Sequence, residues 1–255
     1  MSRAPTVSII IPTLDEATTI DAVLHHLRGL YPPPDEVLVV DGGSADDTVA
    51  RVAAAGVRVI EAPRGRARQQ NLAVEHVTGD IVCFLHADTT LPPDAVAVMR
   101  ATLADPRISL AGFVSIMRGP TRTRWGTTLH NYLKTWYAAA LFKPLMFLRG
   151  ARLLFGDQAM FCRRADFLAV GGFEEVAIME EATLCMRLTA RGRVRQLGRT
   201  CESSDRRVAK WGALRANLMF LYIGFLWGFD LLARGALGRS VVSDRRLADL
   251  YGEER

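Results

Sequence analysis

The chain has 255 residues, of which 49% are apolar and 23% are charged, and its formal net charge is +5. This balance excludes an intrinsically disordered chain and fits one large globular domain, or one domain with a helical appendage. The basic excess is too small to indicate nucleic acid, which we do not expect as a partner. It suits phosphate-bearing ligands or an anionic membrane surface equally well.

Targeting signals are not expected from the sequence. The first apolar run, residues 7–11, is too short for the core of a signal peptide and meets Pro12 directly. No uninterrupted apolar run reaches the ~20 residues that cross a bilayer. We therefore expect a cytoplasmic protein with reduced, buried thiols, since no two cysteines form a Cys-x-x-Cys pair. The cysteines are Cys83, Cys162, Cys185 and Cys201.

The first 105 residues alternate short β-rich runs with amphipathic ones. The β-rich runs predict strands over residues 7–11, 36–40, 57–60 and 81–85. The helical spacing of apolar residues predicts helices over residues 18–30, 44–55 and 65–77. Ser44 stands at the expected N-cap of the second helix. Such alternation predicts a mostly parallel α/β sheet that is covered by helices.

Polar clusters follow three of these strands, over residues 12–16, 41–44 and 86–88. Ligands of parallel sheets bind outside the carboxyl ends of the strands. Because all three clusters fall at such ends, the sequence predicts a binding site at this edge of the sheet.

The second half differs in composition. No acidic residue stands between Asp105 and Asp157, and the later segment 218–232 is almost wholly apolar. Two interpretations stay open: a buried helix that closes the domain, or an interfacial segment on a membrane or a second subunit. The acid-free block interleaves Trp, Tyr and Phe with the basic residues Arg118, Arg122, Arg124, Lys134, Lys143, Arg149 and Arg152.

Short motifs in the two halves carry a family resemblance. The segments VSIIIPTLDE (7–16), VVDGGS (39–44) and FLHAD (84–88) resemble family 2 glycosyltransferases of the GT-A fold. The segments GRARQQN (65–71), FGDQ (155–158) and GGFEE (171–175) resemble one small bacterial branch of that family. Labels of that branch include arsenosugar biosynthesis and association with radical-SAM or selenium genes.

The resemblance implies a GT-A fold, a mostly parallel sheet flanked by helices, with a helical C-terminal appendage. It implies a domain over residues 1–200, with a nucleotide half (1–105) and an acceptor half (106–200), followed by the segment 201–255. The activity implied is inverting sugar transfer from a nucleotide-diphosphate sugar, with UDP favoured, to a small-molecule or lipid-linked acceptor. A homodimer and peripheral contact with the inner face of the cell membrane stay open.

Asp88 is the metal ligand that the resemblance implies. Mg²⁺ or Mn²⁺ prefers hard oxygen ligands, often only one or two carboxylates with substrate phosphates. His86 replaces the first Asp of the usual Asp-x-Asp element, so the ion would rely on Asp88 and the diphosphate, with Ala87 between them. The alternative is that Asp88 caps the following helix.

Further donor-binding residues are expected around the nucleoside and the diphosphate. For the nucleoside, the resemblance implies Pro12, Thr13, Glu16, Asp41 and Gly42, although Asp41 before two glycines is also a common turn sequence. For the diphosphate, a helix N-terminus with two guanidinium groups suits an anion, which favours Arg66 and Arg68. The segment 204–207 also resembles a family segment near the diphosphate, with Val208 replacing an aromatic residue there.

The catalytic base is expected in the stretch MEEA (179–182). Similar enzymes carry a Glu-Asp pair there, so Glu181 replaces the aspartate base and Glu180 precedes it. The extra methylene shifts the carboxylate by ~1 Å, a displacement that can cost ~100-fold in rate. Asp157 and Gln158 are expected to face the acceptor or the sugar.

Two other functions remain alternatives. Nucleotidyl transfer usually needs a glycine-rich loop and a lysine directly after the first strand, and residues 12–15 supply neither. A non-catalytic nucleotide-sugar-binding protein on the same fold is supported only by the replacement of the usual aspartate with Glu181.

Overall fold

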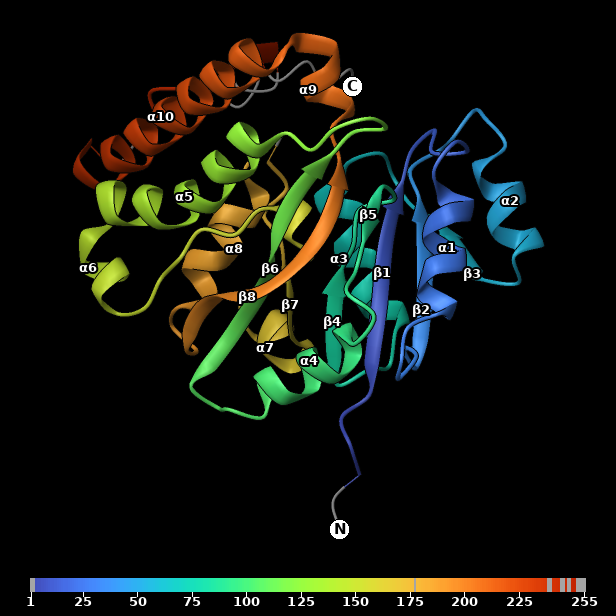
Figure 1. Ribbon diagram of the computed structural model, residues 1–255. Helices are drawn as coiled ribbons and strands as arrows, with labels where there is room; N and C mark the ends of the chain where they lie inside the picture. Colours follow the sequence, from blue (N-terminus) through green and yellow to red (C-terminus); the bar gives the residue numbers. More distant parts are fainter. Residues whose placement is uncertain (1–2, 177, 238–239, 244–245, 247–248, 251–255) are drawn as a thin grey trace.

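A computed structural model describes residues 3–176, 178–237, 240–243, 246 and 249–250, with the side chains of residues 234–237 left out. Eight strands form one sheet in the order β3-β2-β1-β4-β7-β6-β8-β5 (Figure 1). Pairing is parallel through β3, β2, β1 and β4 and between β6 and β8, and β7 is antiparallel to both of its neighbours. The strands are β1 (Val7–Thr13), β2 (Glu36–Asp41), β3 (Arg58–Glu61), β4 (Ile81–Phe84), β5 (Thr89–Thr90), β6 (Ile108–Arg118), β7 (Phe161–Arg163) and β8 (Arg193–Ser204).

Helices cover both faces of this sheet, as the alternation predicts. Ile9 and Ile11 of β1 pack in one core with α1 and α4, while Ile10 faces the opposite core with α3 and α8. Strands buried on both faces are typical of parallel sheets. The helices are α1 (Ile20–Arg28), α2 (Thr48–Ala54), α3 (Arg66–His76), α4 (Ala95–Leu103), α5 (Trp125–Phe142), α6 (Pro144–Leu148), α7 (Arg164–Ala169), α8 (Glu180–Leu188), α9 (Arg206–Trp211) and α10 (Ala213–Leu237).

The expected N-cap at Ser44 is wrong. Helix α2 begins only at Thr48, after Asp47. The Ser44 hydroxyl donates instead to Oδ1 of Asp41 at 2.5 Å, and its main-chain N–H donates to Oδ2. A side chain committed to the turn that ends β2 cannot cap the helix that follows. All four cysteines are buried free thiols, and burial raises the pKa of Cys83.

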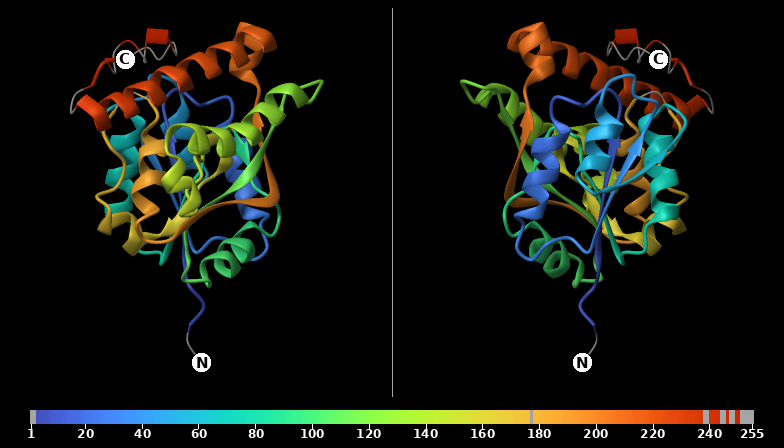
Figure 2. Two further views of the ribbon diagram at one scale, coloured as in Figure 1. Left: turned by 90° about the vertical axis from the view of Figure 1, so that its left-hand side faces the viewer. Right: turned by 90° about the vertical axis from the view of Figure 1, so that its right-hand side faces the viewer.

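The apolar segment of the second half forms the 25-residue helix α10, which lies beside α5 at the edge of the molecule (Figure 2). Its part Ala213–Ala233 is long and apolar enough to cross a membrane, by length and composition alone. The expectation that no uninterrupted apolar run reaches ~20 residues still holds in the sequence. Arg215 and Asp230 interrupt the apolar run in sequence, but they leave the helix long and apolar on average.

Candidate active site

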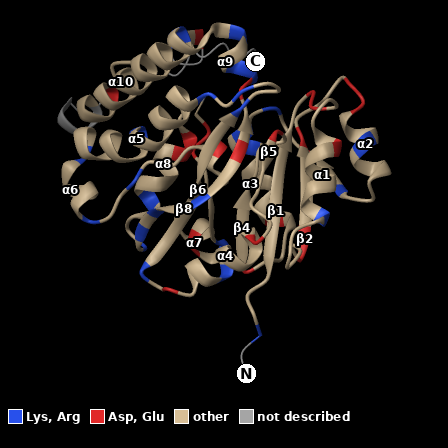
Figure 3. Ribbon diagram, viewed as in Figure 1, with Lys and Arg blue, Asp and Glu red and all other residues tan. Residues whose placement is uncertain are grey.

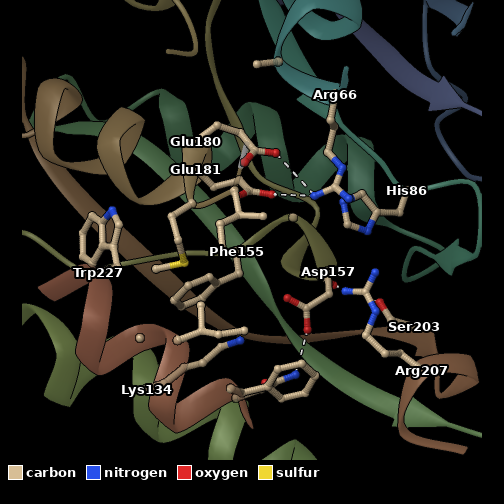
Figure 4. Close-up of a pocket in the computed structure, with 18 of the residues that line it drawn as sticks. Arg66, His86, Lys134, Phe155, Asp157, Glu180, Glu181, Ser203, Arg207 and Trp227 are labelled. Carbon is tan, nitrogen blue, oxygen red and sulfur yellow. Dashed lines mark hydrogen bonds and ion pairs between the residues drawn. The ribbon is translucent and has the colours of Figure 1, made fainter. Parts of the chain in front are cut away.

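A cavity of about 1470 Å³ lies at the carboxyl ends of β1 and β4. Its walls differ in character: the strand ends, α3 and the start of α8 supply charged groups, while α10 supplies apolar ones (Figure 4). Helix α5 supplies apolar residues together with Asn131 and Lys134. Ten expected site residues line it, namely Pro12, Thr13, Glu16, Arg66, Arg68, His86, Asp88, Asp157, Glu180 and Glu181. Four expected site residues do not, namely Asp41, Gly42, Ala87 and Gln158.

Arg206, at the start of α9, joins two carboxylates of the cavity. Its guanidinium donates to both oxygens of Glu16 at 2.9 Å and to Oδ2 of Asp88 at 2.9 Å. The hydrogen bonds to Glu16 are the main cause that raises the pKa of Arg206. Asp88 therefore already binds a positively charged group, because the pairing of β5 with β8 brings residues 118 positions apart together.

Arg66 makes a second charged contact, at the N-terminus of α8. Its Nη1 lies 3.3 Å from Oε1 of Glu180 and 3.5 Å from Oε1 of Glu181. Both glutamates are buried, with 3% and 6% of their surface exposed. Carboxylates in the first turn of a helix are stabilised by its dipole, and a neighbouring cation adds to this. In Figure 4 Arg66 points toward both carboxylates across the cavity.

Gly156 permits His86 and Glu181 to approach each other. A Cβ at this position would lie 2.8 Å from Oε1 of Glu181 and 2.7 Å from Cε1 of His86. No side chain fits there without displacing one of them. Burial, and next the positive charge of Arg66, lowers the pKa of His86 to about 3, so the imidazole is neutral at pH 7. Its buried Nε2 has no hydrogen-bond partner in the described part of the chain.

Asp41 holds the turn after β2 together. Its carboxylate accepts hydrogen bonds from the hydroxyls of Thr13 and Ser44 and from the main-chain N–H groups of Gly43 and Ser44. A carboxylate has about four acceptor positions, and these four donors occupy them. The geometry favours the turn role of Asp41 over contact with a nucleobase.

Asp157 and Gln158 take different places. Asp157 lines the cavity, and its Oδ2 accepts a hydrogen bond of 2.8 Å from Asn131 of α5. Gln158 is fully buried, donates to the Thr135 hydroxyl at 3.1 Å and accepts from the Phe155 N–H. Gln158 thus fixes the loop that carries Gly156 and Asp157.

Two motifs of the bacterial branch contact each other. The Asn71 side chain exchanges two hydrogen bonds of 2.9 Å with the main chain of Phe173, and Arg68 pairs with Glu175 at 2.8 Å. The first contact joins α3 to the loop after α7. The second contact engages Arg68 in a surface ion pair with Glu175 at the cavity.

Lys134 of α5 is a site residue that the motifs do not indicate. Its Nζ lies 3.9 Å from the centroid of the Phe155 ring, and burial lowers its pKa, while Asp157 and Glu181 raise it. The only signal in the sequence is a single lysine within an otherwise uncharged 18-residue helix.

A divalent cation could be bound here by a single carboxylate of the protein together with substrate phosphates. Within the described residues no three His, Cys, Asp or Glu side chains group as a metal site. Asp88 nevertheless offers hard oxygen to a cation, as its contact with Arg206 shows, and Mg²⁺ or Mn²⁺ commonly completes its ligands with substrate phosphates.

A mostly parallel sheet with an acidic and basic cavity at its strand ends is the architecture of GT-A-like proteins. The model of the glycosyl transferase family 2 matches residues 8–170, and the chain belongs to that family. A mannosyltransferase from Pyrobaculum calidifontis, solved with GDP-Man and Mn²⁺, has a TM-score of 0.67 at 22% identity and covers 98% of this chain and 70% of its own.

Relatives with described activities match in part. A glucosyl-3-phosphoglycerate synthase of Mycolicibacterium paratuberculosis is 38% identical over 99 residues, which is 34% of this chain and 30% of that protein. The match thus spans less than a third of that relative. A PGL/p-HBAD biosynthesis glycosyltransferase of Mycobacterium bovis is 30% identical over 178 residues, 67% of this chain and 64% of its own. The structure of the Mycobacterium tuberculosis glucosyl-3-phosphoglycerate synthase with Mn²⁺, UDP and phosphoglyceric acid has a TM-score of 0.62 at 21% identity, covering 88% of this chain and 78% of that one.

Proposed function

We propose that the protein transfers a sugar from a nucleotide-diphosphate sugar, with UDP favoured, to an acceptor hydroxyl. The observation that carries the proposal is that Asp88, Glu181 and three arginines face one cavity at the strand ends. Relatives solved with UDP or GDP-Man and Mn²⁺ support the donor class. The three arginines are Arg66, Arg68 and Arg206.

Asp88 would hold Mg²⁺ or Mn²⁺ together with the diphosphate oxygens. When bound, such an ion offsets the negative charge that develops on the leaving group. Arg66 and Arg206 line the same cavity as this carboxylate, and they would bind the phosphates once the donor replaces their present partners.

Glu181 would act as the general base of an inverting transfer. Its carboxylate takes the proton of the acceptor hydroxyl, whose oxygen attacks the anomeric carbon from the side opposite the diphosphate. The bond between that carbon and the phosphate oxygen breaks, and the nucleoside diphosphate leaves with the electron pair. His86, which Gly156 lets lie close to Glu181, is neutral and adds no second positive charge beside the base.

The finer assignments are part of the same proposal. Residues 1–200 would form the catalytic domain and residues 201–255 its appendage, except that β8 runs on to Ser204 and Arg206 lines the cavity. Residues 1–2, 177, 238–239, 244–245, 247–248 and 251–255 lie outside the described part. The branch labelled with arsenosugar biosynthesis and radical-SAM or selenium genes stays our assignment on the strength of the motifs 65–71 and 171–175. We place the protein in the cytoplasm.

The proposal is tested by incubating the protein with a panel of UDP- and GDP-sugars and Mn²⁺ and measuring release of the nucleoside diphosphate. We expect slow hydrolysis of one donor, with the released sugar of inverted anomeric configuration by NMR. Binding of a nucleotide without release from any donor would support the non-catalytic alternative. Retention of configuration would remove Glu181 as the base of an inverting reaction.

A further inference from the structure

One face of α10 is an exposed apolar stripe. A helix that is apolar all round is typical of a buried or membrane-associated helix, yet only 33% of the apolar part of α10 is buried. The opposite face, with Ile223 and Trp227, packs in the core beside α5. The stripe consists of Leu214, Leu218, Leu221, Tyr222, Phe225, Phe229 and Leu232, which lie three or four residues apart except for the adjacent Leu221 and Tyr222 and are 44–76% exposed.

The stripe is continuous with the cavity. Leu221 and Phe225 both belong to the stripe and line the cavity, and Leu141 of α5 lines it while being 63% exposed. The cavity of about 1470 Å³ exceeds the ~300–1,000 Å³ that is usual for one small-molecule ligand. Its polar end accounts for the nucleotide-sugar, so its apolar end is left for the acceptor and opens onto the stripe.

The charges near the stripe are positive. Arg122 in the β6–α5 loop, Lys210 in α9 and Arg215 in the first turn of α10 are exposed, and none forms an ion pair within the described residues. Figure 3 shows basic segments near α9. The only acid among the described side chains of α10 is Asp230, which is buried and accepts a hydrogen bond from Ser240. A second copy of the chain would bring like charges together across a symmetric interface, whereas an anionic bilayer attracts them.

We propose that the stripe of α10 rests on an anionic lipid bilayer, so that an amphiphilic lipid acceptor can extend its head group into the cavity. The claim that a lipid acceptor enters the cavity rests on the proposed function, whereas the claim that the stripe contacts a bilayer does not. The helix would lie in the interface rather than span the bilayer, because its other face is committed to α5 and holds the buried Asp230.

A pair of labelled variants tests the contact. Since all four native cysteines are buried, a thiol introduced by Phe229→Cys can be labelled selectively with an environment-sensitive fluorophore. The matched control is Leu168→Cys, which is 46% exposed on α7, at the other end of the molecule (Figure 1). With phosphatidylglycerol–phosphatidylcholine vesicles at low salt, we expect a blue shift for Phe229→Cys alone, weaker in high salt and with pure phosphatidylcholine. No shift, or equal shifts for both labels, would overturn the proposal.

A stripe variant separates this proposal from the catalytic one. Leu218→Gln, Phe229→Gln and Leu232→Gln combined change exposed residues that do not line the cavity. We expect co-flotation with the same vesicles to fall about tenfold or more, while stabilisation by UDP and Mn²⁺ in a thermal-shift assay stays as in the wild type. A wild-type dimer that this variant dissociates, without flotation, would assign the stripe to a second copy instead. Flotation without any nucleotide binding would leave the bilayer contact standing and overturn the proposed function.

Discussion

The two ends of the cavity are built in different ways. At the polar end, charged groups from β1, β4, α3, α8 and α9 meet, and almost every one already has a partner, such as Arg206 with Glu16 and Asp88. At the apolar end, α5 and α10 supply large side chains that are only half covered. Paired charges can exchange one partner for a charged ligand, whereas uncovered apolar surface gains by contacting any apolar one. The polar end is thus suited to selecting a donor, and the apolar end to accommodating a larger acceptor.

The largest effect is expected at the polar end, from Glu181→Gln. Loss of a general base typically lowers the rate by about 100- to 10,000-fold, and we expect kcat of donor turnover to fall within this range. Binding of UDP with Mn²⁺ should persist. Glu180→Gln is the matched control, with a smaller loss, because Oε1 of Glu181 is among the atoms nearest to the Cβ position of Gly156, together with His86. Equal losses in the two variants would contradict the assignment of Glu181.

Adding a methyl group by a glycine-to-alanine substitution should have different effects at the two ends of the cavity. Gly156→Ala places a Cβ 2.8 Å from Oε1 of Glu181, and the displaced carboxylate should lower kcat by about 100-fold. Gly224→Ala of α10 meets nothing within 4 Å and should raise the free energy of unfolding by about 0.5–1 kcal/mol, as alanine does in a helix. Steady-state kinetics and urea denaturation measure these effects. If Gly156→Ala kept full activity, the close approach would have no catalytic role.

The variant Arg206→Ala tests whether Arg206 and Mn²⁺ compete for the carboxylate of Asp88. The guanidinium occupies Oδ2 of Asp88, and a partly exposed ion pair contributes roughly 1 kcal/mol at most. We therefore expect the Mn²⁺ concentration that half-saturates UDP binding to fall by up to about fivefold. Turnover should nevertheless decrease, since the phosphates lose a cation. An unchanged or raised Mn²⁺ requirement would show that Arg206 does not compete for Asp88.

The smallest effect concerns the pH dependence of stability. Burial lowers the pKa of Lys134 below its unfolded value of about 10.4. Between the two values the unfolded chain binds more protons, so the wild-type free energy of unfolding rises with pH there. Lys134→Met removes this contribution. Denaturation with urea should show the wild type gaining stability relative to the variant as pH rises from 7 toward 10, and a constant difference would contradict the lowered pKa.

The N-terminal half was predictable from sequence because local patterns determine it. Continuous apolar runs predict strands such as β4, which is buried on both faces, and the polar residues after them include Asp88. Local sequence patterns do not show whether a carboxylate already accepts hydrogen bonds from its neighbours. Asp41 is therefore expected at the nucleoside, although its acceptor positions are filled within the turn.

The remaining site residues depend on contacts between distant segments. Arg206 reaches Asp88 only because β8 ends beside β5, and Lys134 reaches Phe155 only because α5 packs over the loop after it. The role of Gly156 likewise depends on His86 and Glu181, which lie far away in sequence. Single charges in apolar helices, and glycines between motif residues, are the weak local signals of such contacts.

The most direct test of the account is calorimetric titration of UDP and GDP into the protein with and without Mn²⁺, in the wild type and in Asp88→Ala. In the proposed function, the polar end of the cavity binds a diphosphate through a cation on Asp88. We expect one nucleotide to bind in the presence of Mn²⁺, and its affinity to fall about tenfold or more in Asp88→Ala, as for loss of a charged ligand. Mn²⁺-dependent binding of equal affinity in Asp88→Ala would contradict the central claim.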